Sequence, residues 1–191
     1  MKLLRTAIPD VLIVEPTVFG DDRGWFTESY NARAFARAVT ELGLPPPPEL
    51  VQDNHSCSHA GVLRGLHYQL APHAQAKLVR VVKGAAWDVA VDIRPASPTF
   101  GRWVGAELTA ANRRQLWIPV GFAHGFVALE DDTHFLYKTS AYYAKDCERA
   151  IRWDDARLAI AWPLPAGQAP RLAPKDAAAP HLADMAAADL P

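Results

Sequence analysis

The stretch KLVRVVKGAAWDVAVDIRP, residues 77–95, is the clearest indication of the fold class, because side chains in its second half alternate with a period of two. The larger apolar side chains fall on one face: Trp87, Val89, Val91 and Ile93. The other face carries Asp88, Ala90 and Asp92. Such alternation is typical of a β-strand, so the stretch predicts strand structure in the middle of the chain.

Further strand-like runs follow this stretch: RWVGAEL (102–108), RQLWIP (114–119), GFVAL (125–129) and HFLYKTS (134–140). Short turns that contain Gly, Pro, Asn or Asp separate them, at the spacing expected of a sandwich or barrel. The sequence therefore predicts an all-β fold, a jelly-roll barrel of antiparallel strands in two sheets with a few short peripheral helices.

One short helix is predicted before residue 44, because Phe35, Val39 and Leu42 recur at helical spacing. Asn31 is suited to cap its N-terminus, and Gly43 is suited to end it. The prolines of LPPPPEL, residues 44–50, exclude a longer helix.

The length of 191 residues predicts a single domain over residues 1–191, since domains hold roughly 100–200 residues. From about residue 163 the chain becomes rich in Pro and Ala, which predicts a C-terminal, partly helical extension of that domain. Within it we expect Asp176 to be ordered and the last several residues to fray.

Charge and cysteine content exclude several functional classes. A formal net charge of −1 gives no general attraction to nucleic acid or anionic lipid, so neither partner is expected. Four residues interrupt the apolar N-terminal stretch: Pro9, Asp10, Glu15 and Pro16. Neither a secretory signal nor a membrane span is therefore expected, which predicts a cytoplasmic protein.

Cys57 and Cys147 lie too far apart for a metal-binding or redox motif, and we expect reduced thiols.

The segment WIPVGFAHGFVAL, residues 117–129, contains a Pro-x-Gly-x-x-His pattern that ends at His124. This pattern resembles the second element of the cupin jelly roll, in which the histidine points into the barrel. Metal-binding cupins add a His-x-His pair and a Glu from a first element, which gives the ion three or four ligands.

The matching first element here is His67-Tyr68-Gln69, followed by His73 and Lys77. One histidine of the pair is missing, and no carboxylate lies between residues 67 and 87. A lysine ammonium would also repel a divalent ion. The sequence therefore predicts a site without a metal, and no cofactor motif is present.

Taken alone, the polar residues of these motifs have more than one interpretation. His67 in VLRGLHYQ, residues 62–69, suits a buried structural histidine as well as a base. Tyr137 suits a packed tyrosine with a satisfied hydroxyl. Lys77 shares a strand face with two valines, so it lies at a sheet edge or faces a polar cavity. Asp176, before a run of alanines, suits a surface helix cap.

Many motifs in one order resemble the dTDP-4-dehydrorhamnose 3,5-epimerase family, a metal-free branch of the cupins. They are TAIPDVLI, EPTVFGDDRGWFTESYN, VQDNHS, VLRGLHYQ, KLVRVVKG, DVAVDIR, SPTFGRWVG, RQLWIPVGFAHGFVAL, FLYKTSAYY and PKDAAAP. The resemblance implies an isomerase without a cofactor, usually a homodimer. Such an enzyme inverts C3 and C5 of dTDP-4-dehydro-6-deoxy-D-glucose on the route to dTDP-L-rhamnose.

Both carbons are alpha to the C4 ketone, so removal of either proton gives an enolate. Inversion needs a base on one face of the sugar, an acid on the other, and a cation or donor at the ketone oxygen. The resemblance assigns these catalytic roles to His67, Tyr137 and Lys77, in that order. Asp176 would hold the His67 imidazole in the required tautomer.

The resemblance also implies a larger set of side chains that bind the dTDP-sugar: Phe19, Arg23, Glu28, Gln52, Asp53, Asn54, Arg64, His124, Tyr142, Glu148 and Lys175. Arginines suit the diphosphate, amides suit the sugar hydroxyls, and Phe19 or Tyr142 suits stacking on thymine. Without the resemblance, Arg23 and Glu28 read as surface charges.

Strict alternation would place Arg64 and His67 on opposite strand faces, although the resemblance puts both at the ligand. A bulge or strand break near Gly65 would reconcile them.

Two alternative functions stay open. One is epimerisation at C3 or C5 alone, or ketoisomerisation, of a related dTDP-sugar; the other is a non-catalytic jelly roll that binds a sugar nucleotide.

Overall fold

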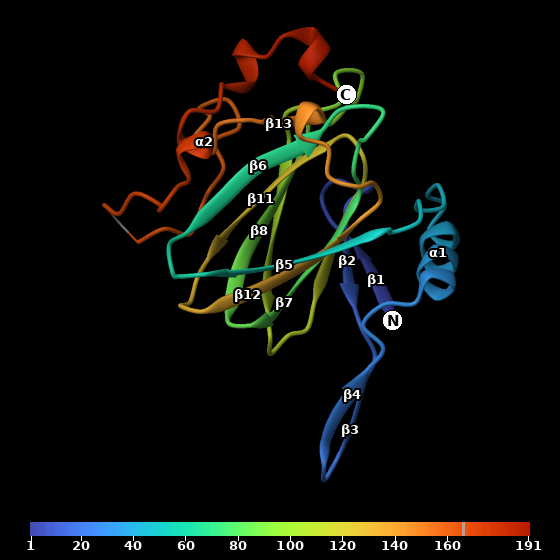
Figure 1. Cartoon of the computed structure of the whole chain (residues 1–191). Helices are drawn as coiled ribbons and strands as arrows, with labels where there is room; N and C mark the ends of the chain where they lie inside the picture. The colour runs from blue at the N-terminus through green and yellow to red at the C-terminus, as the bar shows by residue number, and fades with distance from the viewer. Residues whose placement is uncertain (166) are drawn as a thin grey trace.

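The computed structural model describes residues 1–165 and 167–191, so Ala166 of the predicted C-terminal extension lies outside the described residues. The strands form a two-sheet jelly roll with a small separate hairpin (Figure 1). All strand pairs within the sheets are antiparallel. The predicted all-β jelly roll is therefore confirmed.

The six-stranded sheet has the order β1-β2-β10-β7-β12-β5. Its strands are β1 Lys2–Arg5, β2 Leu12–Glu15, β10 Gln115–Ile118, β7 Lys77–Lys83, β12 Thr133–Thr139 and β5 Gln52–Ser58. The five-stranded sheet has the order β13-β6-β11-β8-β9. Its strands are β13 Glu148–Ala150, β6 Leu63–Gln69, β11 Phe122–Ala128, β8 Ala85–Asp92 and β9 Trp103–Thr109. The hairpin pairs β3 Val18–Asp21 with β4 Gly24–Thr27.

The helices are short and peripheral, as the sequence predicts: α1 Ala32–Glu41, α2 Pro174–Ala177, and the 3-10 turns η1 Lys145–Cys147, η2 Leu182–Asp184 and η3 Ala187–Asp189. In α1 the Asn31 side chain accepts a hydrogen bond from the backbone N–H of Ala34 at 3.1 Å, which confirms the predicted cap. Gly43 follows the helix with φ +75°, a conformation that favours glycine and ends the helix.

The stretch 77–95 forms two strands rather than one, because Gly84 turns the chain between β7 and β8. Gly84 has φ +76°, and a Cβ atom at this position would lie 2.5 Å from the hydroxyl oxygen of Thr133. Only glycine fits this close approach without displacement. The two halves of the stretch consequently enter different sheets and bring their side chains to opposite walls of the barrel.

Both faces of β8 are almost entirely buried, because each face packs against a different part of the molecule. On the inner face Ala86 and Ala90 join the core between the sheets. On the outer face Val89 and Val91 belong to a second cluster, which includes Leu182 of the C-terminal segment. The segment therefore covers the outer face of the five-stranded sheet (Figure 1).

The end of the chain is held more firmly than the sequence predicts. The Tyr68 hydroxyl donates to the carbonyl of Asp189 at 2.6 Å, and Arg149 forms an ion pair with the Asp189 side chain at 2.6 Å. Leu190 packs against the outer cluster. The last residues therefore pack against the barrel and do not fray as expected, because the segment covers apolar strand residues that would otherwise face water.

Strand β6 contains the irregularity that the sequence predicts near Gly65. His67 pairs with His124 and Arg64 with Phe126, so three steps along β6 match two along β11. Gly65 has φ +122°, and a Cβ atom there would lie 2.6 Å from the Cα atom of Gly125. The extra residue turns Arg64 and His67 toward the same cavity, which resolves their apparent conflict.

Cys57 and Cys147 are both free, as expected. Among the described residues, no helix combines the length and the apolar character needed to cross a membrane.

Candidate active site

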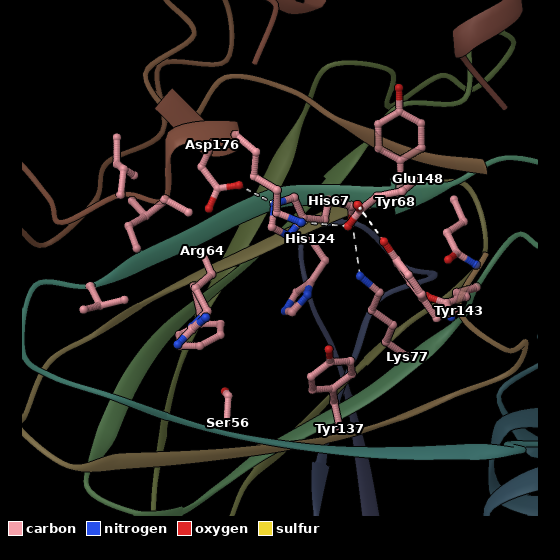
Figure 2. Close-up of a pocket in the computed structure, with 18 of the residues that line it drawn as sticks. Ser56, Arg64, His67, Tyr68, Lys77, His124, Tyr137, Tyr143, Glu148 and Asp176 are labelled. Carbon is pink, nitrogen blue, oxygen red and sulfur yellow. Dashed lines mark hydrogen bonds and ion pairs between the residues drawn. The ribbon is translucent and has the colours of Figure 1, made fainter. Parts of the chain in front are cut away.

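A cavity of about 460 Å³ opens between the two sheets beneath the C-terminal segment (Figure 2). Its lining contains eight of the predicted site residues: His67, Tyr137, Lys77, Asp176, Arg64, His124, Glu148 and Lys175. The remaining lining residues are Ser56, Val62, Leu63, Tyr68, Gln69, Gln75, Phe126, Tyr143, Arg171, Leu172 and Ala173. All four residues with predicted catalytic roles therefore meet in one place.

His67 and Asp176 form a close pair although 109 positions separate them. His67 comes from β6, and Asp176 comes from α2, the short helix above that strand (Figure 2). The Nε2 atom of His67 lies 2.6 Å from Oδ1 of Asp176, whose side chain is 2% exposed. An Nε2–H group that donates to the carboxylate leaves Nδ1 of the imidazole with a lone pair, as a base requires.

Lys77 begins β7, which lies between β10 and β12 in the six-stranded sheet, so it is not at a sheet edge. Its side chain is buried, and its ammonium donates to the backbone carbonyl of His67 at 3.3 Å. Burial lowers the pKa of Lys77 to about 8, although Asp88 and Glu148 favour its charged form. The cavity thus holds a weakly paired cation beside the His67 strand.

Tyr137 comes from β12 and points its hydroxyl into the cavity from the side opposite His67 (Figure 2). Burial raises the pKa of Tyr137, while the nearby charges of Arg64 and Lys175 act in the other direction. The phenol is therefore protonated at neutral pH and is available as a proton donor.

His124 forms a second histidine–carboxylate pair in the same cavity. Its Nε2 atom lies 2.8 Å from Oδ2 of Asp88 on the neighbouring strand β8. Burial lowers the pKa of His124 and raises the pKa of Asp88. The second carboxylate oxygen of Asp88 is buried and has no hydrogen-bond partner among the described residues.

Cationic side chains gather at the mouth of the cavity, where Arg64, Arg171 and Lys175 contribute to its lining. Lys175 pairs with Glu148 at 2.9 Å. Burial opposes the charge on Glu148, but the hydrogen bond and charge of Lys175, together with the Tyr143 hydrogen bond and the charge of His67, lower the Glu148 pKa. Arginine and lysine side chains at the mouth of this cavity suit a ligand with a charged phosphate group.

The predicted residues of β5 do not line the cavity. Gln52 and Asn54 are joined by a side-chain hydrogen bond of 2.9 Å, and the Gln52 amide oxygen accepts from the backbone of Tyr143 at 3.0 Å. Asp53 lies on the other face of the strand, because strand side chains alternate, and it pairs with Lys138 at 3.3 Å.

Three other predicted residues lie on or beside the β3–β4 hairpin, which projects away from the barrel (Figure 1). Phe19 is exposed, and Arg23 pairs with Asp21 at 2.5 Å within the hairpin. Glu28 accepts a hydrogen bond from Asn31 at 3.3 Å, at the start of α1. Within one chain, none of the three lines the cavity.

The sequence reasoning missed several lining residues. Ser56 follows Gln52 and Asn54 on the inner face of β5, so alternation alone could have found it. Its hydroxyl is buried without a partner among the described residues. Tyr143 lines the cavity, whereas its neighbour Tyr142 does not, and no sequence pattern separates the two. Arg171 arrives through an isolated bridge to Val62, a contact that local sequence does not encode.

Both cavity histidines have a carboxylate partner, which leaves few free donor atoms for a metal ion. Within the described part of the chain, three ligand-type side chains come together outside the cavity instead: Cys57, Asp132 and His134. The absence of a metal from the cavity stays a prediction of the sequence.

Residues 5–184 match a protein family described as dTDP-4-dehydrorhamnose 3,5-epimerase. The enzyme of that name from Shigella flexneri is 57% identical over 92% of this chain and 93% of its own length. The enzyme of that name from Pseudomonas aeruginosa is 56% identical over 96% of this chain and 97% of its own length.

A solved structure is also similar over the whole chain. It is the dTDP-6-deoxy-D-glucose-3,5-epimerase of Legionella pneumophila in complex with dTDP-4-keto-L-rhamnose. The identity is 48% and the TM-score is 0.91, with 100% of this chain and 97% of that chain covered.

Proposed function

Because this chain belongs to the dTDP-4-dehydrorhamnose 3,5-epimerase family, we propose that it inverts C3 and C5 of dTDP-4-dehydro-6-deoxy-D-glucose. The product is dTDP-4-dehydro-L-rhamnose. Each inversion removes a proton from a carbon next to the C4 ketone, passes through an enolate, and returns a proton to the opposite face of the ring.

One observation carries this proposal: the candidate base and the candidate acid come from opposite sheets. His67 lies on β6 of the five-stranded sheet, and Tyr137 lies on β12 of the six-stranded sheet. A sugar ring held between the sheets has one face toward each residue. His67 then takes the proton from one face, and Tyr137 returns one to the other.

Lys77 is the proposed stabiliser of the enolate oxygen. Its buried ammonium has one hydrogen bond to a backbone carbonyl and no ion pair among the described residues. A cation in a site that excludes water stabilises developing negative charge more than the same cation in bulk water. Protonated Lys77 therefore lowers the energy of the enolate relative to the ketone.

Asp176 is the proposed positioning partner of His67. The 2.6 Å contact fixes the imidazole ring and favours the imidazolium that forms after proton removal. Arg64, Arg171 and Lys175 are placed to bind the diphosphate of the substrate, and Glu148 holds Lys175 at the mouth. His124 completes the inner wall.

We also propose that the chain acts as a single-domain homodimer in the cytoplasm. Three aromatic side chains of the β3–β4 hairpin are exposed: Phe19, Trp25 and Phe26. An exposed apolar group of this kind marks a protein interface. In the proposed dimer the hairpin reaches the cavity of the second copy and brings Phe19, Arg23 and Glu28 to its substrate. Analytical ultracentrifugation that finds the active enzyme to be a monomer would contradict this arrangement.

The function is tested by incubation with dTDP-4-dehydro-6-deoxy-D-glucose in deuterated water. Deuterium at C3 and at C5, together with the L-lyxo product, is the expected result in proton NMR. Label at only one carbon would instead indicate a mono-epimerase. No label at either carbon would indicate a protein that binds the nucleotide sugar without catalysis.

A further inference from the structure

Outside the cavity, four polar side chains meet on the outer face of the six-stranded sheet: His55, Cys57, Asp132 and His134. Cys57 and His134 are directly paired across strands β5 and β12. His55 lies two residues before Cys57 and therefore shares its face. Asp132 belongs to the turn that precedes β12. The cluster has no part in the proposed epimerisation.

Three of these residues place metal-ligating atoms close together. The Oδ1 atom of Asp132 lies 3.1 Å from the Cys57 sulfur and 3.1 Å from Nε2 of His134. All three ligating atoms lie within 4.8 Å of one another. Zinc bond lengths of about 2.0–2.3 Å put the donors of a tetrahedral site roughly 3.3–3.6 Å apart, so small movements complete the geometry.

The fourth residue supplies the outer contact that a metal-bound histidine needs. The Nδ1 atom of His134 lies 2.9 Å from Nε2 of His55. In this structure Nε2 of His134 is hydrogen-bonded to Oδ1 of Asp132. An Nδ1–H group of His134 that donates to His55 lets Nε2 lose its proton and bind an ion in place of that hydrogen bond. Outer hydrogen bonds of this kind orient ligand histidines in known metal sites.

The neighbouring lysine leaves the proposed ligand atom of Asp132 accessible. Lys83 pairs with Oδ2 of Asp132, which is not the oxygen that faces Cys57 and His134. Its side chain is 62% exposed, so its ammonium can move into water when a cation arrives.

We propose that Cys57, Asp132 and His134 bind a divalent ion of the zinc type, with His55 as the outer partner of His134. A thiolate, an imidazole and a carboxylate favour Zn²⁺ or a similar late transition metal over Mg²⁺ or Ca²⁺, which prefer oxygen ligands alone. Three protein ligands leave the fourth position to water. The site lies behind the cavity, because Ser56, between His55 and Cys57, faces inward.

Titration of the reduced protein with Co²⁺ tests the site, because a thiolate bound to Co²⁺ gives a charge-transfer absorption band in the near ultraviolet. The wild-type protein is expected to show this band with one Co²⁺ per chain. Zn²⁺ is expected to displace the Co²⁺ and so to remove the band. Cys57→Ser is expected to remove the band. Cys147→Ser, which changes the other free cysteine, is the matched control and is expected to keep it.

The outer partner gives a graded second arm. His55→Ala is expected to keep the band and to weaken Co²⁺ binding by about 10–100-fold, the usual effect of an outer hydrogen-bond partner. His134→Gln is expected to weaken binding more than His55→Ala while the thiol remains. Thermal melts of each variant report whether it is folded.

Three results would overturn the proposal: no Co²⁺ binding below millimolar concentration, binding without the thiolate band, or a band that Cys147→Ser removes and Cys57→Ser keeps.

Discussion

Two histidine–carboxylate pairs lie in the same cavity, and they differ mainly in their access to it. His67 and His124 are directly opposite each other on β6 and β11. Their ring nitrogens lie 2.6 and 2.8 Å from Asp176 and Asp88. The His67 side chain is 23% exposed, whereas that of His124 is 7% exposed.

A carboxylate partner alone therefore does not make a histidine a base. Burial lowers the pKa of His124 and raises the pKa of Asp88, so taking up a proton at His124 costs more than it would in water. His67 has a partner of the same kind and an open side toward the substrate. We therefore propose that the first pair moves protons and the second pair holds the wall and the charge balance near Lys77.

The largest effect is expected for His67→Ala, which should abolish deuterium incorporation at both C3 and C5, because no enolate forms without the base. Proton NMR in deuterated water measures this exchange. The thermal melt should fall as well, because the change leaves the buried Asp176 carboxylate without its partner, so the exchange rate is compared for the folded fraction. Exchange at the wild-type rate would instead show that His67 is a structural residue like His124.

Asp176→Asn comes next, with an expected loss of exchange no larger than about 10²–10⁴-fold, the range of general acid–base catalysis. The imidazole remains and can still remove a proton, but its imidazolium loses a charged partner. The same exchange assay measures the loss. A loss equal to that of His67→Ala would show that Asp176 does more than position the ring.

His124→Ala should reverse the pattern and affect stability more than chemistry. It leaves the buried Asp88 carboxylate without its partner, and breaking a buried pair costs about 3–5 kcal/mol. Denaturant unfolding should detect a loss near the lower end of that range, because Asp88 can take up a proton. The exchange rate of the folded fraction should fall by only about tenfold, roughly one lost hydrogen bond. Full stability with abolished exchange would make His124 the proton carrier.

The smallest effect concerns pH. The pKa of Lys77 in the folded protein is about 8, and its protonated form is the one proposed to stabilise the enolate. The value of kcat/KM should therefore be half-maximal near pH 8 and fall as the pH rises further. The residual activity of Lys77→Met should lack this descending limb. Retention of the limb in the variant would assign it to another group.

Much of this architecture could be predicted from local pattern. The alternation in residues 77–95 predicts strands, and β9, β10 and β12 agree with their predicted ranges to within one residue at each end. The bulge at Gly65 follows from the conflict between Arg64 and His67, since only an extra residue puts both on one face. Local pattern does not predict the break at Gly84, because the role of this glycine depends on contact with Thr133 in another strand.

The limits of the prediction lie where distant segments meet. Strand alternation could have separated Asp53 from Gln52 and Asn54, because neighbouring residues point to opposite faces. No local pattern could have brought Arg171 to the cavity, since the path of the C-terminal segment depends on the apolar face of β8. The cluster around Cys57 likewise joins two strands that only the sheet order makes neighbours.

Tyr137→Phe separates proton removal from proton return, the two steps proposed to occur from opposite sheets. The change keeps the aromatic ring and removes only the hydroxyl. In deuterated water His67 should still form the enolate and return deuterium to the original face. This division of roles between the two sheets predicts labelled substrate with little inverted product, measured by proton NMR at C3 and C5 beside a thermal melt. An unchanged ratio of inversion to exchange would contradict it.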